Sequence, residues 1–185
     1  MKNWKLLPNN PHVAKYVECY WFLEKEADDV GNNHPKLNPD PSAHLIISNQ
    51  KFQYTQDSTS QEGCGSHWIF PHRQTFTMDH SDPFKIIGIK FRVGALHSLK
   101  RVLSDKKLEQ VEYSDIHKLV QSESFTTEIL LLNSAKQPQQ ACDKLDKILA
   151  PWLSNSLEDK HSELVNRILP LLGSTPISQI KVLSH

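Results

Sequence analysis

The chain has 185 residues, of which 21 are lysine or arginine and 21 are aspartate or glutamate, so its formal net charge is +0. This balance is untypical of a self-sufficient DNA-binding domain, which usually carries a basic face and a high isoelectric point. No stretch approaches the roughly 18 apolar residues of a membrane span, and the N-terminal apolar run is too short for a signal peptide, so we expect a soluble cytoplasmic protein without a membrane partner.

The first half of the chain consists of short runs with a bias toward strand-forming residues. The expected strands are 15–23, 43–48, 52–55, 67–70, 74–78 and 84–91. Clusters of proline, glycine, asparagine, aspartate and serine at 28–42 and 57–66 predict loops between them. Many short strands at regular spacing indicate an antiparallel sandwich or barrel.

After Gly94 the pattern becomes helical. Short helices are expected at 95–103, 114–122 and 125–132, and a longer one opens at Pro138, a favoured first helical residue. Its apolar stripe either forms a dimer surface or packs on its own barrel or on the 95–103 helix, and the sequence leaves these options open. The stripe consists of Ala141, Leu145, Ile148, Leu149 and Trp152.

The end of the chain has the pattern of two helices joined by a turn. A polar linker at about 155–159 precedes an amphipathic helix that begins near Ser162. Gly173 provides the stop, and Thr175 with Pro176 provides the cap and first position of the next helix. This pattern is typical either of the opening of a helix-turn-helix domain without its recognition helix or of a helical hairpin that closes an unrelated domain.

Segment 164–185, LVNRILPLLGSTPISQIKVLSH, resembles the start of the AraC/XylS-type DNA-binding domain. Gly173, Ile177, Ile180 and Ser184 stand at positions of that motif, whereas Lys181 replaces its usual small alanine. Three further segments resemble the N-terminal sensor domains of one AraC subgroup. They are PNNPHVAKYVECYW at 8–21, NPDPSAHLIIS at 38–48 and IIGIKFRVGALHSLKRVL at 86–103, with Pro41 and Val93 departing from the pattern.

The resemblance implies an α+β chain, in which a cupin-like antiparallel β-barrel is followed by a helical region. The barrel sensor would span 1–93, a dimerisation and linker region 94–155, and the incomplete beginning of the DNA-binding domain 156–185. The implied function is effector sensing and dimerisation in a transcriptional regulator. The implied partners are an unknown small-molecule effector, a second copy of the chain, and DNA, which would be bound through a C-terminal domain mostly absent from this chain. We therefore expect no complete set of DNA-binding residues in the chain.

A small eight-stranded barrel has room for packed side chains or for one small ligand. An effector pocket inside the barrel would be lined by aromatic and polar side chains, although the aromatic residues could equally fill the core. The candidate ligand-binding residues are Tyr20, Trp21, His44, Trp68, Phe76 and Arg92.

Catalytic and metal-binding patterns are sparse. The chain has no nucleophile elbow, no zinc-protease motif and no phosphate-binding glycine loop, so we expect no enzyme activity, no catalytic residue and no cofactor. Cys64, His72 and His80 prompt a metal hypothesis, but the two histidines are eight residues apart, which is about 26 Å along one strand. We therefore expect no metal site, and a metal-dependent cupin-type enzyme remains the alternative function. Three cysteines far apart in sequence indicate unpaired thiols in a reducing compartment.

Overall fold

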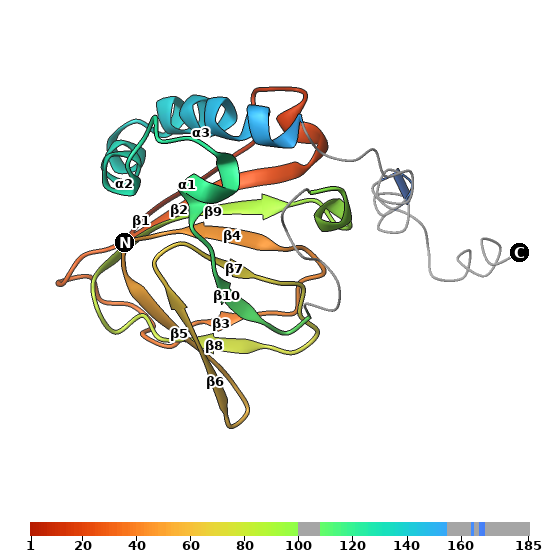
Figure 1. Ribbon diagram of the computed structural model, residues 1–185. Helices are drawn as coiled ribbons and strands as arrows, with labels where there is room; N and C mark the ends of the chain where they lie inside the picture. The colour runs from red at the N-terminus through yellow and green to blue at the C-terminus, as the bar shows by residue number, and fades with distance from the viewer. Residues whose placement is uncertain (100–107, 155–163, 165–166, 169–185) are drawn as a thin grey trace, which may run out of the picture.

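A computed structural model describes residues 1–99, 108–154, 164 and 167–168 (Figure 1). Within these residues the chain forms two antiparallel sheets and three helices, which confirms the α+β class. The six-stranded sheet contains, in order, β1 (Lys2–Leu6), β2 (Val17–Lys25), β9 (Phe84–Phe91), β4 (His44–Ile47), β7 (His67–Ile69) and β10 (Val111–Tyr113). The four-stranded sheet contains β3 (Lys36–Leu37), β8 (Phe76–Met78), β5 (Lys51–Gln56) and β6 (Thr59–Cys64).

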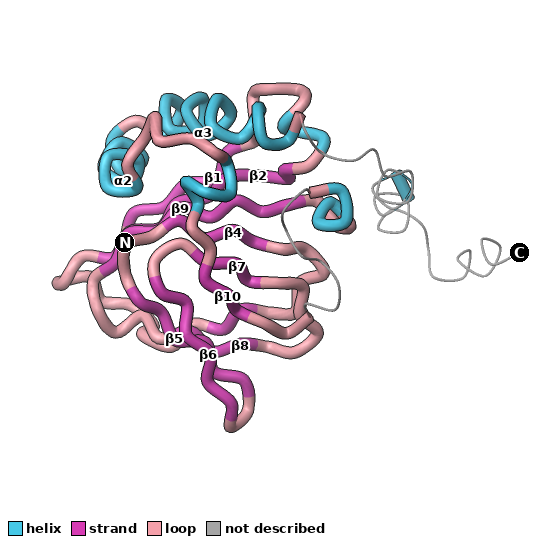
Figure 2. Tube along the Cα trace, in the orientation of Figure 1, coloured by secondary structure: helices cyan, strands magenta, loops and turns pink. Residues whose placement is uncertain are grey.

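The helices lie together over one face of the six-stranded sheet (Figures 1 and 2). They are α1 (Ile116–Val120), α2 (Thr127–Lys136) and α3 (Pro138–Leu153), and two 3-10 turns, η1 (Val13–Lys15) and η2 (Ala95–Ser98), accompany the sheet. Asp115 and Thr126 cap α1 and α2 by accepting backbone N–H bonds, and Pro138 occupies the start of α3. No helix among the described residues is long and apolar enough to cross a membrane.

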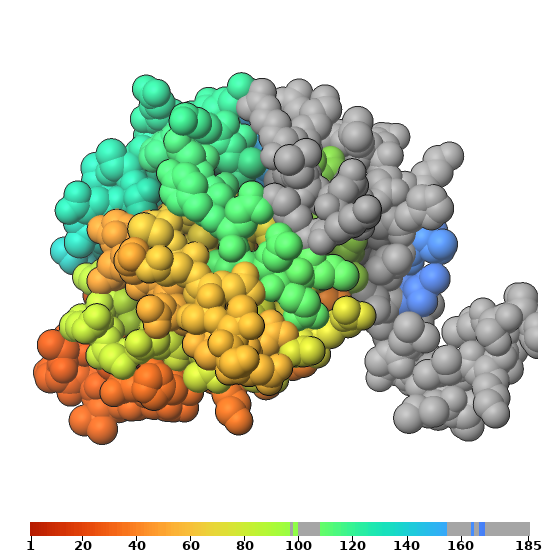
Figure 3. Space-filling model, turned by 60° about the horizontal axis from the view of Figure 1, so that its bottom comes forward, coloured from red at the N-terminus to blue at the C-terminus, as the bar shows by residue number. Residues whose placement is uncertain are grey.

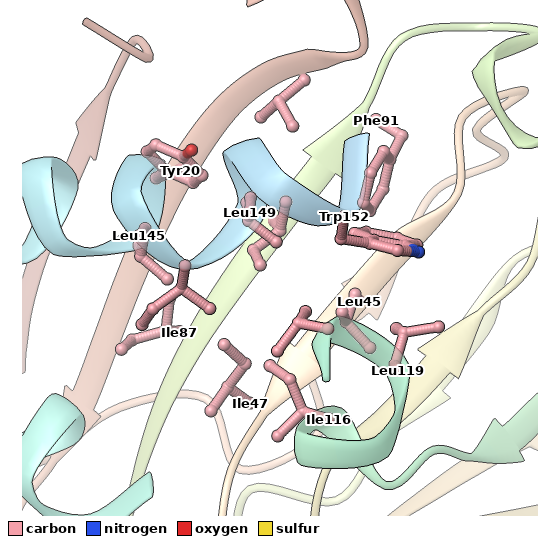
Figure 4. Packing of buried hydrophobic residues seen from close by; sticks show 14 of the residues in the cluster. Tyr20, Leu45, Ile47, Ile87, Phe91, Ile116, Leu119, Leu145, Leu149 and Trp152 are labelled. Carbon is pink, nitrogen blue, oxygen red and sulfur yellow. The ribbon is translucent and has the colours of Figure 1, made fainter. Parts of the chain in front are cut away.

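The larger core fills the space between the six-stranded sheet and the helices. Figure 4 shows strand residues such as Leu45 and Ile87 facing helix residues such as Leu145 and Leu149 across this layer. The apolar stripe of α3 therefore packs on the protein's own sheet, which is one of the options that the sequence left open. Burying a Leu or Ile side chain contributes about 1.5–3 kcal/mol, so this layer holds α3 firmly.

A second core lies between the two sheets. Its buried members are Ile46, Phe52, Tyr54, Ile69, Phe76, Phe84 and Ile86. Both faces of the central strands β2, β4 and β9 are thus covered, and buried residues follow one another along them with little interruption.

The two sheets approach each other where β6 lies beside β10, as the space-filling view also shows (Figure 3). The side chain of Gln61 on β6 donates to the carbonyl of Glu109 at 2.7 Å and accepts the N–H of Val111 at 2.8 Å. The described strand pairings define two separate sheets, so the closed cupin-like barrel stays a prediction.

Several expected elements agree with the structure and others do not. The expected strand at 84–91 is confirmed as β9 with the same bounds, and the expected helix from Pro138 is α3. Strands β1, β3, β6 and β10 were not expected, and β10 lies in the stretch predicted to be helical. The expected helix at 95–103 is the short turn η2 as far as it is described, and the predictions for 155–163 and 169–185 lie outside the described residues.

Candidate functional site

The six candidate ligand-binding residues do not surround one cavity. Tyr20 on β2 and Trp68 on β7 belong to the core beneath the helices, whereas Trp21 packs against the core between the sheets. Adjacent residues of a strand point to opposite faces, so Tyr20 and Trp21 cannot line the same pocket. The structure therefore does not bring the six residues to a single pocket, and a ligand-binding role for them stays a prediction.

Tyr20 has a structural role in the described contacts. Its hydroxyl donates to the Asp146 carboxylate on α3 at 2.7 Å, and that carboxylate also accepts the backbone N–H groups of Asn9 and Asn10 at 2.8 Å. Burial, together with the neighbouring carboxylate of Asp146, raises the pKa of Tyr20 well above its ordinary value. This network ties the N-terminal segment, β2 and α3 together.

Phe76 lies in a packed aromatic cluster between the sheets. Its ring lies 6.3 Å from that of Tyr54 and 4.9 Å from that of His72, measured between ring centroids. His67 Nδ1 donates to the carbonyl of Gly65 at 2.8 Å, so its Nε2 accepts from the Tyr54 hydroxyl at 2.7 Å. Burial lowers the pKa of His67 to about 4, which keeps the ring neutral at neutral pH. For Phe76, the alternative of core filling fits the structure better than ligand binding.

A cavity of about 600 Å³ lies where β4 begins and where β7 and β9 end. It has the size of a small-molecule site. Gly94, whose φ is 80°, turns the chain from β9 into η2 along its edge; a left-handed φ of this kind favours glycine. The walls are mainly apolar and include Pro39, Pro41, Ala43, Pro71, Val93 and Leu96.

Two arginines provide the positive charge of this cavity. Arg92 donates from Nε to the carbonyl of Ala14 at 2.7 Å, and its terminal guanidinium nitrogens have no hydrogen bond or ion pair with any described residue. Arg73 lies at the surface, where its backbone N–H donates to Glu109 at 2.7 Å and its Nε lies 3.5 Å from the same carboxylate oxygen. Of the six predicted residues, Arg92 lines this cavity.

The acidic residue that lines the cavity, Asp40, is already paired. Its Oδ2 lies 2.9 Å from Lys90 Nζ and 3.2 Å from His44 Nε2, and its Oδ1 accepts the backbone N–H of Ser42 at 2.8 Å. Burial opposes ionisation of Asp40, but the hydrogen bonds from His44, Lys90 and Ser42 outweigh it and hold the pKa of this carboxyl well below its usual range. His44 therefore contacts the Asp40 carboxylate, and its ring lies 6.3 Å from that of Trp21, measured between ring centroids.

The structure does not bring the metal candidates together. In the part of the chain that is described, no group of three His, Cys, Asp or Glu side chains has a metal-binding arrangement. Both ring nitrogens of His72 lie at backbone carbonyls, 3.1 Å from that of Phe70 and 3.0 Å from that of Asn38. His80 packs on Phe84, with ring centroids 4.3 Å apart.

Sequence reasoning missed Asp40 and Arg73 as neighbours of Arg92. The signal was weak but present: proline-flanked polar residues occur just before β4, at Pro39-Asp40-Pro41, and just after β7, at Pro71-His72-Arg73. Loops that adjoin the same end of a sheet and carry polar side chains are common places for binding sites. Only the pairing of β4 with β7 and β9 shows that these loops meet Arg92.

Together, the two antiparallel sheets, the helical layer and the cavity at a sheet end define an α+β domain with a ligand-sized pocket. Residues 5–110, more than half of the chain, match the family described as "Domain of unknown function (DUF6597)", and the chain belongs to this family. The matched region contains every described residue that lines the cavity. No curated protein matches the chain significantly.

Proposed function

We propose that this chain is the effector-sensing and dimerising part of an AraC-type transcriptional regulator, whose DNA-binding domain begins within 156–185. One observation supports the proposal above all others. The two central segments that resemble AraC-type sensors, 38–48 and 86–103, both contribute residues that line the same cavity. Residues with a sensor-like pattern thus converge on a pocket large enough for a small effector.

Homodimerisation belongs to this proposal. The apolar stripe of α3 is occupied by the protein's own sheet, so a dimer would use other surfaces. On α2 the side chains of Ile129 and Leu132 are exposed, although neighbouring positions of that helix are buried. Light scattering of the purified chain measures this part of the proposal, and a strictly monomeric chain across the micromolar range would contradict it.

The regulatory function is tested by DNA binding. We expect the complete product of the gene to bind fragments of its neighbouring promoters in a sequence-dependent way. The 185-residue chain alone should not do so, because its net charge is +0 and affinity for DNA depends on phosphate neutralisation by clustered lysine and arginine. Mobility-shift assays with both proteins make the comparison. The regulatory proposal fails if the complete product shows no sequence-dependent binding either with or without a metabolite extract.

Metal analysis of the same preparation addresses the alternative function. Stoichiometric iron, zinc or manganese would favour a metal-dependent cupin-type enzyme over the regulator. A preparation without stoichiometric metal that still binds an organic ligand would favour the sensor.

A further inference from the structure

We propose that the cavity at the ends of β4, β7 and β9 binds a small organic carboxylate with an apolar body, whose carboxylate is held by Arg92 and Arg73. The inference rests on the proposed function, because it names the chemical class of the effector. It assigns the apolar walls to the ligand body and the two guanidinium groups to its charged end.

The walls favour an apolar ligand body. Three prolines, one alanine, one valine and two leucines line most of the cavity surface, and proline side chains bring little rotamer entropy to lose on binding. An apolar group that enters such a pocket gains by removal of its surface from water. A fully hydrophilic ligand, such as a polyphosphate, would leave these walls without a matching contact.

The charge of the cavity favours an anionic end group. The carboxylate of Asp40 is paired with Lys90, so it is not the partner of either arginine; Arg73 has its own carboxylate neighbour in Glu109. Arg92 is half-buried, and its terminal nitrogens have no described partner, which leaves donors to hold a planar carboxylate in the bidentate geometry that arginine favours.

Both arginines contact neighbouring residues that restrict their position. Arg92 is anchored to the η1 turn through the Ala14 carbonyl, and its own backbone N–H donates to the carbonyl of Tyr16 at 2.7 Å. Glu109, whose φ of 59° is uncommon for a non-glycine residue, holds the backbone and Nε of Arg73. Such preorganisation lowers the entropic cost of binding a ligand.

The test is calorimetric titration of the intact 185-residue chain with phenylacetate and with octanoate. Each acid is compared with its neutral alcohol, phenylethanol or octanol, which keeps the apolar body and removes the charge. We expect saturable binding of at least one acid, and binding of the matching alcohol weaker by at least about tenfold, because a charge-assisted hydrogen bond is lost. The proposal is overturned if neither acid binds at millimolar concentration, or if acid and alcohol bind equally.

Variants locate the binding. Arg92→Gln should weaken binding of the acid at least about tenfold and leave the alcohol nearly unaffected. Because Arg92 also contacts Ala14, the exposed Arg73→Gln provides a second variant that leaves the fold intact, with an expected loss of about threefold or more. Lys118→Gln, which removes one exposed positive charge on α1, is the matched control and should bind normally. Unchanged acid binding in both arginine variants would refute the assignment.

Failure of this inference differs from failure of the proposed function. If the complete gene product binds promoter DNA specifically while the chain ignores both acids, the regulator stands and the ligand class is wrong. If the acids bind through Arg92 but the complete product has no specific DNA binding, the site stands and the regulatory function is wrong.

Discussion

The close contact between Gly88 and Trp21 allows a sharp test of the packing between the sheets. Gly88 on β9 pairs with Trp21 on β2, and a Cβ added at Gly88 would lie 1.8 Å from Cε2 and 2.1 Å from Cζ2 of the indole. Real Cβ atoms do not come so close to other atoms, so Gly88→Ala must displace the ring. Overpacking of this kind costs about 1–3 kcal/mol of unfolding free energy.

The measurement is urea unfolding followed by far-UV circular dichroism. Gly88→Ala should lower the midpoint at an unchanged m value. Gly31→Ala is the control, because a Cβ at Gly31 would have nothing within 4 Å, and its effect should stay within about 0.5 kcal/mol.

A double variant identifies the cause of the loss. Trp21→Leu removes the indole, so the added cost of Gly88→Ala should largely disappear in the Trp21→Leu background. A coupling of about 1–3 kcal/mol between the two sites would follow from this direct contact. The reasoning is refuted if Gly88→Ala costs no more than Gly31→Ala, or if its cost is the same with Leu at position 21.

Two further predictions concern buried polar groups. Asp146→Ala should destabilise the chain by at least about 3 kcal/mol in urea unfolding, because it leaves the Tyr20 hydroxyl and two backbone N–H groups without their acceptor. The control, Asp143→Ala, removes one exposed hydrogen bond to Asn9 and should cost less than about 1 kcal/mol. Equal losses of unfolding free energy in the two variants would contradict the proposed role of the Asp146 network. His67 has a pKa of about 4 in the fold and a reference value of 6.5, so its contribution is present above pH 6.5 and is lost as pH falls toward 4, by roughly 2 kcal/mol at pH 5. The drop in stability between pH 7 and pH 5 should be smaller in His67→Gln, and an identical drop would show that His67 titrates normally.

Much of the architecture could be predicted from local patterns. The run Phe84–Phe91 is apolar and β-branched, with polar breaks before it, and the structure keeps its bounds as β9. Pro138 starts α3, whose apolar stripe repeats at helical spacing. Strands β6 and β10 escaped detection because their stability comes from backbone pairing at sheet edges, and their exposed side chains include polar residues such as Ser60 and Glu112.

Local sequence patterns were sufficient to predict the α+β composition, the central strands and the helix that begins at Pro138, and they named Arg92, which lines the cavity. The tertiary structure decided which face each strand residue uses, because both faces of β2, β4 and β9 are covered by apolar layers and hydrophobicity cannot distinguish them. It therefore separated Tyr20 from Trp21. It also brought Asp40 and Arg73 to Arg92, since antiparallel pairing joins loops that are distant along the chain, and no local pattern records which strands become neighbours.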